Sequence, residues 1–251
     1  MTPYLPELED DAMLGNGYEA LYLQPAFFAR RLAFARNQAQ WLAEHYRDDM
    51  VVVEIGPGLG LVAEGFLARF PGATYHMIEP HEWFANFIAD RLGARVCLHR
   101  QAGADALSTV LAGIGARPVL LYLDNVLEHV AGPRVMLEDI KGRVQRASVA
   151  LIDVPNEYGL KGRHRVYTAI GAQSTVCTNH INLFTKRAFA TMLDGLGLRH
   201  DIHQRGIRTR EEVNCLPKGP ALDMVLRLLR LVPIDTMLGL GNNLRVAVYF
   251  D

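Results

Sequence analysis

The stretch "VVVEIGPGLG", residues 51–60, decides the fold of this chain. Its first five residues form a short, mostly β-branched run, which is typical of a strand buried on both faces. Glycine then occupies every second position, at Gly56, Gly58 and Gly60. Glycine permits a positive φ and lets a ligand come close to the backbone. The stretch therefore predicts a buried strand, a ligand-binding turn and the start of a helix.

Strand and helix patterns alternate after this turn. Each connection is long enough for a helix, which predicts a Rossmann-like, doubly wound α/β fold with a mostly parallel sheet. Two later strands bring the expected sheet to seven, and a further helix follows Thr185 as its N-cap. The expected strands are 51–55, 74–79, 95–100, 118–124, 148–155, 199–207 and 244–250, and the expected helices between the first five are 60–70, 81–92, 105–114 and 133–145.

Two segments lie outside this alternation. Residues 1–46 predict an N-terminal helical cap, whose helical pattern is interrupted near Pro25. Residues 47–251 form the expected main domain, with a helical insert at about 208–241, before the last strand. The insert contains an amphipathic helix, which we expect to pack within the fold or to act as a lid rather than to contact a membrane.

Composition excludes several classes of protein. The chain has 251 residues, half of them hydrophobic, and a formal net charge of -1, so it lacks the basic excess of a nucleic-acid-binding protein. It has no apolar run long enough to span a membrane. The N-terminus is acidic and lacks a signal-peptide core, which favours a cytoplasmic location. The three cysteines form no CxxC pair, so no zinc or redox motif is indicated.

Two ligand classes compete for the glycine turn. A dinucleotide-binding turn has the spacing G-x-G-x-x-G, whereas this chain has its third glycine at Gly60 and a leucine at position 61. Glu54 precedes the turn by two residues, and a carboxylate there repels phosphate but suits a cationic ligand. The spacing and this acid favour a cation over a dinucleotide.

Motifs along the chain resemble those of the class I S-adenosylmethionine (SAM) methyltransferases, in particular the small-molecule enzymes of the ubiquinone-pathway and natural-product type. The resemblance covers roughly residues 45–251 in the expected order. It implies SAM as cofactor, S-adenosylhomocysteine (SAH) as product and an antiparallel last strand. The segments that carry it are "VVVEIGPGLG", "MIEP", "YLDNVLEHV", "ALIDVPNEYG", "HINLFTKRAFATMLDGLGLR" and "GNNLRVAVYF".

The resemblance also implies which residues contact SAM. Glu79 corresponds to the acid that accepts hydrogen bonds from both ribose hydroxyls. Asp105 is either the acid near the adenine amino group or the N-cap of its helix, and both interpretations stay open. Tyr18, from the cap, either closes over SAM, because aromatic faces attract sulfonium-type cations, or is a core residue, and both interpretations stay open. The full expected set is Glu54, Gly56, Gly58, Gly60, Glu79, Pro80, Asp105, Asp124, Asn125 and Tyr18.

Three residues are candidates for catalysis. His129 follows the fourth strand, where ligands lie in open α/β sheets, and its pKa range suits a general base. The competing interpretation is that it braces the next helix. His180 is the second candidate base, and Tyr158 lies in a loop that commonly lines the acceptor. The nearby basic loop 161–165 would favour an acidic acceptor if it faces the pocket.

A metal is not expected. In some ubiquinone-pathway relatives a Glu-His pair, with an acid three residues before the Glu, is associated with a divalent metal. Here the pair is Glu128 and His129, but the earlier position holds Asn125, a neutral amide. The sequence therefore predicts no metal ligands.

The sequence favours methyl transfer to a small-molecule acceptor, with oxygen ahead of nitrogen or carbon. A second hypothesis is a SAM-using enzyme that transfers or cyclises the aminobutyrate arm and releases methylthioadenosine. A third is a SAM-binding partner without turnover, and a NAD-dependent dehydrogenase is disfavoured by the glycine spacing. A homodimer remains open.

Overall fold

The computed structural model of the 251-residue chain describes residues 22–101, 104–156, 180–205 and 243–251, together with 220, 224, 227, 228 and 241. Of residues 104 and 105 it describes the backbone alone. Among the predictions made above, Tyr18, Tyr158, the basic loop 161–165 and nearly all of the insert at 208–241 lie outside these residues.

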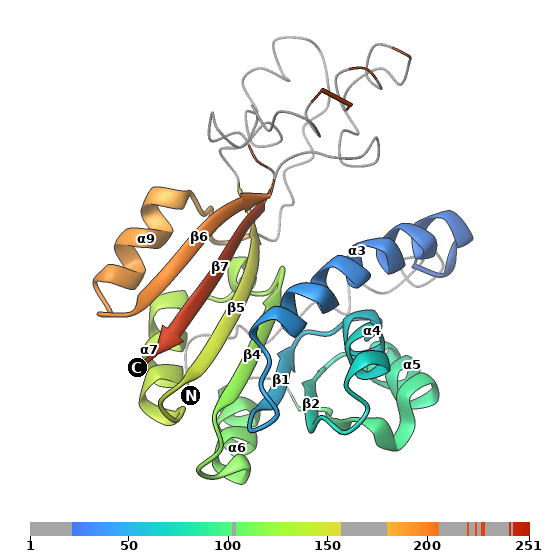
Figure 1. Ribbon diagram of the computed structural model, residues 1–251, viewed down its shortest axis with the longest axis horizontal. Coiled ribbons are helices and arrows are strands. Elements are labelled where there is room, and N and C mark those ends of the chain that lie inside the picture. The colour runs from blue at the N-terminus through green and yellow to red at the C-terminus, as the bar shows by residue number, and fades with distance from the viewer. Residues whose placement is uncertain are drawn as a thin grey trace.

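The seven strands form one sheet with the order β3-β2-β1-β4-β5-β7-β6 (Figure 1). Strands β1 to β5 run parallel, and β7 runs antiparallel to both β5 and β6. This arrangement confirms the predicted Rossmann-like fold with an antiparallel last strand. The strands are β1 Val51–Ile55, β2 Tyr75–Ile78, β3 Cys97–His99, β4 Val119–Asp124, β5 Ser148–Pro155, β6 Arg199–Arg205 and β7 Asn243–Phe250.

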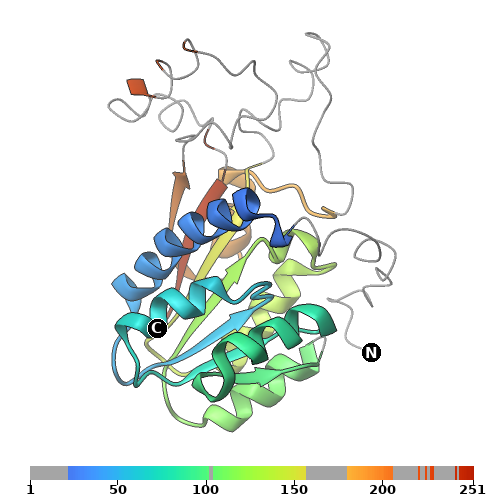
Figure 2. The ribbon, with the colours of Figure 1, turned by 90° about the vertical axis from the view of Figure 1, so that its right-hand side faces the viewer.

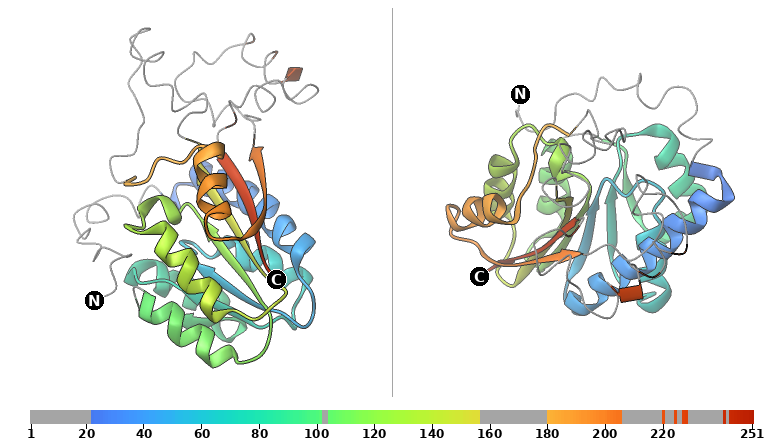
Figure 3. Two further views of the ribbon diagram at one scale, coloured as in Figure 1. Left: turned by 90° about the vertical axis from the view of Figure 1, so that its left-hand side faces the viewer. Right: turned by 90° about the horizontal axis from the view of Figure 1, so that it is seen from above.

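Helices cover both faces of the sheet. Helices α3, α4 and α5 lie on one face (Figure 2), and α6, α7 and α9 lie on the other (Figure 3). Their bounds are α3 Pro25–His45, α4 Leu61–Arg69, α5 Glu82–Leu92, α6 Ala104–Ile114, α7 Pro133–Arg143 and α9 Lys186–Asp194, and two short 3₁₀ turns are η1 Gly93–Arg95 and η2 Leu127–His129. No helix among these described segments is long and apolar enough to cross a membrane.

Strand β1 illustrates why the sequence of a strand that is covered on both faces is almost entirely apolar. All five of its residues are buried. Val51 and Val53 belong to the cluster on the α6 and α7 face, whereas Val52 belongs to the cluster on the α3 and α4 face. Side chains alternate between the faces of a strand, so a strand covered on both faces needs apolar residues throughout.

Two helix termini follow the predicted local signals. Helix α3 begins at Pro25, because proline at the first helical position loses no intrahelical hydrogen bond. In α9 the Thr185 side chain accepts a hydrogen bond of 3.0 Å from the Ala188 N–H, which confirms the predicted N-cap.

Helix α3 packs directly on the main domain. Its buried residues join the hydrophobic cluster that includes Val52 and Tyr122 of the sheet. A Cβ placed on Gly65 of α4 would lie 3.2 Å from the Ala39 Cβ, so the two helices approach closely at that glycine. The division into a cap at 1–46 and a domain at 47–251 stays a prediction, and α3 shares its core with the sheet.

The ends of the insert lie together at one edge of the sheet. Residues Arg205 and Asn243, which end β6 and begin β7, are partners in the antiparallel register. Next to them, the Gly241 carbonyl accepts a 2.7 Å hydrogen bond from the Asn156 side chain, just beyond β5. The Gly241 N–H donates to the Gln204 side chain at 3.3 Å. The chain therefore leaves and re-enters the sheet at neighbouring points.

Candidate active site

The glycine turn forms at the carboxyl end of β1. Gly56, Gly58 and Gly60 all have positive φ, at 66°, 55° and 66°. Gly60 is the N-cap of α4, so the helix N-terminus, with its partial positive charge, lies directly behind the turn. A Cβ on Gly56 would lie 2.8 Å from Cγ2 of Val126, which brings the loop after β4 against this turn.

Glu79 connects the end of β2 to the glycine turn. Its Oε2 accepts a hydrogen bond of 3.0 Å from the Gly58 N–H, and its Oε1 accepts one of 2.9 Å from the His81 N–H. Burial raises the pKa of Glu79 to about 7, and these two hydrogen bonds oppose the rise. The expected role, holding ribose hydroxyls, has to use the remaining lone pairs of these oxygens. The sequence did not predict that Glu79 also fixes the turn.

Glu54 lies near the end of β1 on the face covered by α3, and 3% of its surface is exposed. Its Oε2 accepts a hydrogen bond of 2.8 Å from the Tyr75 hydroxyl of β2. Burial raises the pKa of Glu54 to about 8, and this hydrogen bond opposes the rise. A cation beside this carboxyl group would favour its ionised form.

Asp124 and Asn125 follow β4 directly. The Asn125 Nδ2 donates to Asp124 Oδ1 at 2.8 Å, and the Asn125 N–H donates to the Asp153 carbonyl, also at 2.8 Å. Asn125 has a φ of 53°, a conformation that asparagine tolerates better than most residues do. The loop therefore turns sharply at the carboxyl edge, beside Val126 and the glycine turn.

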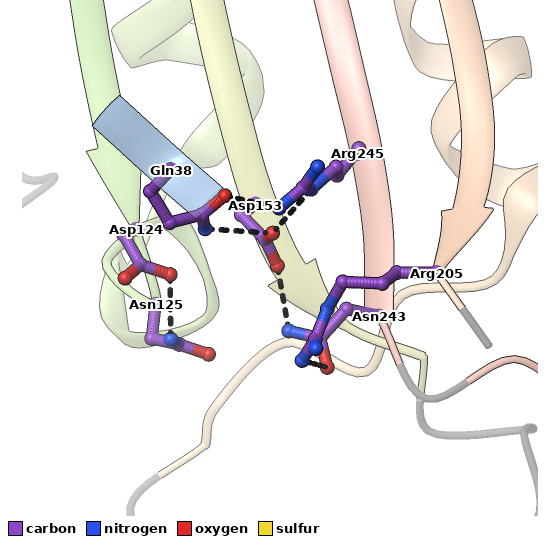
Figure 4. A network of polar contacts seen from close by, with 7 residues as sticks. All are labelled: Gln38, Asp124, Asn125, Asp153, Arg205, Asn243 and Arg245. Atoms are coloured by element: carbon purple, nitrogen blue, oxygen red, sulfur yellow. Dashed lines mark hydrogen bonds and ion pairs between the residues drawn. The ribbon is translucent and has the colours of Figure 1, made fainter. Parts of the chain in front are cut away.

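Charged side chains of both signs affect the pKa of Asp124, and several of them are drawn in Figure 4. Burial raises the pKa of Asp124 to about 7, and the carboxylate of Asp153 adds to the rise. The guanidinium groups of Arg31, Arg205 and Arg245 lower the pKa and so limit this rise. Asp124 therefore lies where a small change in the surrounding charge changes its protonation near neutral pH.

Asp153 is the centre of a buried polar network that the sequence did not predict (Figure 4). Its side chain accepts hydrogen bonds from Gln38 Nε2 at 3.0 Å, Asn243 Nδ2 at 2.6 Å and Arg245 Nε at 3.3 Å. Arg245 also donates to the Gln38 side chain, which closes the network. The partners are 90 to 115 residues from Asp153 in sequence, so no local pattern indicates the contact.

His129 and His180 come together on one buried carboxylate. The Nε2 atom of each imidazole lies 3.9 Å from Oε1 of Glu128. The two rings meet edge to face, with centroids 4.9 Å apart. The Glu128 side chain is 1% exposed, whereas those of His129 and His180 are 28% and 13% exposed. The two candidate bases of the sequence thus share one site, and Glu128 is the member that sequence reasoning left without a role.

A backbone contact fixes His180 beside this carboxylate. The Ile181 and Asn182 N–H groups both donate to the Glu128 carbonyl at 3.0 Å. The Asn182 side chain also donates to the Val130 carbonyl at 2.6 Å. The segment that leads into α9 is therefore held on the loop after β4, although Asn182 and Glu128 are 54 residues apart in sequence.

The remaining predicted residues fall in different places. Pro80 is exposed and precedes α5. Asp105 lies inside the first turn of α6, which begins at Ala104, so it is not the residue before the helix, and the N-cap interpretation is wrong. Its side chain, Tyr18 and Tyr158 lie outside the described residues.

Comparisons with known proteins give structural matches alone. No protein-family model and no curated protein sequence matches the chain. An O-methyltransferase family protein from Burkholderia thailandensis matches with a TM-score of 0.57 and 16% identity, over 95% of this chain and 62% of that one. The chain therefore spans less than two thirds of that protein.

Two further solved structures match over nearly their whole length. The plantazolicin methyltransferase BpumL, in complex with a monoazolic desmethylPZN analog and SAH, has a TM-score of 0.57 and 14% identity, over 97% of this chain and 92% of that one. A SAM-dependent methyltransferase from Thermotoga maritima, a possible histamine N-methyltransferase, has a TM-score of 0.53 and 14% identity, over 95% and 97%. The chain thus has the fold of the SAM-dependent methyltransferases.

Proposed function

We propose that this protein is a SAM-dependent methyltransferase that acts on a small-molecule acceptor. The observation that carries the proposal is the glycine turn at the end of β1, with three glycines at positive φ and the Glu79 carboxylate bonded to the Gly58 N–H. In open α/β sheets, ligands bind at this carboxyl edge. The fold shared with SAM-dependent methyltransferases supports SAM as that ligand.

The charges around the turn support a cationic donor. Glu54, Glu79 and Asp124 all have raised pKa values, chiefly because they are buried. Three partly protonated carboxyl groups would gain from a ligand that carries an ammonium group and a sulfonium. A pyrophosphate would meet repulsion from each of them. Dinucleotide chemistry is therefore disfavoured by electrostatics as well as by the glycine spacing.

The acceptor side is formed by His129 and His180, beside the loop that touches the turn. In methyl transfer a lone pair of the acceptor attacks the methyl carbon, the C–S bond breaks, and its electron pair returns to sulfur to give the thioether of SAH. A proton on the attacking atom has to leave. The two imidazoles are placed to assist that departure. We favour an oxygen acceptor over nitrogen or carbon because an oxygen acceptor gains most from such assistance.

Measurement of SAM binding is the first test of the proposed function. The proposal predicts that calorimetric titration of the purified chain shows binding of SAM and SAH and no binding of NAD. Glu79→Ala should weaken SAM binding about tenfold or more, because a charge-assisted hydrogen bond contributes about 1.5–3 kcal/mol. Glu82→Gln, at an exposed position three residues along, is the matched control. Binding of NAD without binding of SAM would overturn the proposal.

The product nucleoside separates the competing functions. Incubation with SAM and candidate acceptors, followed by mass spectrometry, should yield SAH. Methylthioadenosine in its place would mean that the aminobutyrate arm moves. The absence of both nucleosides, with SAM binding intact, would favour a binding partner without turnover.

His129 is the residue to change on the acceptor side. His129→Ala should lower kcat by about 10²–10⁴-fold, the range for loss of a group that assists proton removal. SAM affinity should stay unchanged. His203→Ala, at an exposed site on β6, serves as the control. Unchanged turnover in His129→Ala, with normal SAM affinity, would assign the acceptor side to other residues.

A further inference from the structure

The cluster of Glu128, His129 and His180 has the composition of a metal site. The three side chains each present one ligand-type atom, and these atoms all lie within 4.8 Å of one another. The sequence predicted no metal, because the neutral Asn125 stands where some relatives have the acid that accompanies the Glu-His pair. In the structure the Asn125 amide bonds to Asp124, and a histidine from the segment before α9 completes the cluster. The complete set of candidate ligands can therefore be recognised only in the folded structure.

The spacing suits a single ion. In a tetrahedral site with ligands about 2.0–2.1 Å from the metal, neighbouring ligand atoms lie roughly 3.3 Å apart. Each imidazole Nε2 lies 3.9 Å from Oε1 of Glu128, and the three ligand atoms lie within 4.8 Å of one another, so closures of about 0.6–1.5 Å would bring them to this spacing.

The scaffold fixes the ligands before any ion binds. Glu128 belongs to η2, and its carbonyl accepts hydrogen bonds from the Ile181 and Asn182 N–H groups. This contact holds the residue after His180 against the residue before His129. Preorganised ligands on separate segments bind metals more tightly than ligands on a mobile chain, because less entropy is lost.

Exposure shows where a further ligand can enter. The carboxylate of Glu128 is buried, and the two imidazoles are partly exposed. Three protein ligands with one open side are the arrangement of catalytic rather than structural metal sites.

We propose that Glu128, His129 and His180 bind one divalent transition-metal ion, and that this ion binds the acceptor atom that receives the methyl group. The two imidazoles favour ions such as Zn²⁺, Fe²⁺ or Ni²⁺ over Mg²⁺ or Ca²⁺, which prefer oxygen ligands. A bound cation would increase the acidity of an acceptor hydroxyl, whose proton passes to solvent before its oxygen attacks the methyl carbon. The second half of the proposal rests on the proposed methyl transfer, and the first half does not.

Metal binding is measured directly. The full-length chain is stripped with a chelator and titrated with Co²⁺, whose visible absorption reports its ligands, and with Zn²⁺ by calorimetry. We expect about one equivalent of either ion, and at least about 100-fold weaker binding in Glu128→Gln and in His180→Ala, because loss of a ligand costs at least as much as loss of a residue that orients one. Circular dichroism and SAM titration of the variants report folding.

A second imidazole pair supplies the matched control. His76 Nδ1 and His99 Nε2 lie 2.9 Å apart on β2 and β3, away from the proposed site. His76→Ala should leave the one equivalent intact. Loss of metal in His76→Ala, undiminished metal binding in Glu128→Gln, or no metal bound by the wild type would overturn the proposed metal site. Full turnover by the chelated chain would overturn the second half of the proposal, in which the ion binds the acceptor. If the wild type does not bind SAM, the proposed function is overturned, whereas the result on metal binding is unaffected.

Discussion

Glu54 is the one charged residue in a strand that is otherwise apolar. Its carboxyl group is buried against the Tyr75 hydroxyl, and burial raises its pKa to about 8. In the ligand-free protein at neutral pH, Glu54 is therefore protonated in most of the molecules. The sequence identified this acid from its place before the turn, but it did not indicate that burial would raise the pKa or that Tyr75, 21 residues away, would oppose the rise.

The raised pKa makes stability depend on pH. Between the ordinary pKa and about 8, the unfolded chain loses the Glu54 proton while the folded chain keeps it, so stability falls as pH rises through that window. Glu54→Gln removes this dependence. It should match the wild type at pH 4.5 and exceed it by about 2–4 kcal/mol at pH 8, measured by urea unfolding of the ligand-free chain.

The control for this experiment is Glu44→Gln, which alters an exposed acid on α3. Glu79 and Asp124 have raised pKa values too, so the wild-type curve contains their contributions in the same direction. The difference between wild type and Glu54→Gln isolates the contribution of Glu54. Equal slopes for these two proteins from pH 4.5 to 8 would contradict the prediction.

At the scale of the element, one buried polar side chain of α3 adds hydrogen bonds to the apolar packing that holds this helix on the sheet. Gln38 donates to Asp153 of β5 and accepts from Arg245 of β7, so one glutamine joins a helix to two strands. The periodic pattern of α3 predicted a helix and its apolar stripe. It gave no reason to expect that a glutamine would be fully buried, because its partners lie far along the chain.

Gln38→Ala should therefore destabilise the fold. The change leaves the buried Asp153 and the partly buried Arg245 with fewer partners, and such a loss costs about 1–3 kcal/mol. Gln40→Ala on the same helix is the control, because Gln40 bonds to Glu44 at the surface. Urea unfolding at one pH compares the two variants. A cost for Gln38→Ala no larger than that for Gln40→Ala would mean that the network does not anchor α3.

At the scale of the whole molecule, the order of motifs predicted the sheet. Right-handed crossovers and alternating strands and helices leave few arrangements, so five strands and the glycine turn were enough to place the cofactor edge. The pairing of His180 with Glu128 was beyond such reasoning. It depends on a return of the chain to the loop after β4, and on two backbone hydrogen bonds that any sequence can form. Local patterns encode elements, whereas the pairing of His180 with Glu128 depends on how distant segments meet.

The neighbouring ends of the insert have a consequence for how this protein changes over time. Arg205 and Asn243 are register partners, and Gly241 is bonded to Asn156 and Gln204. Because the chain leaves the sheet and returns at adjacent points, closure costs little whatever the length of the segment between them. The length of the segment between Arg205 and Asn243 can therefore change during evolution at little cost to the stability of the seven-stranded sheet.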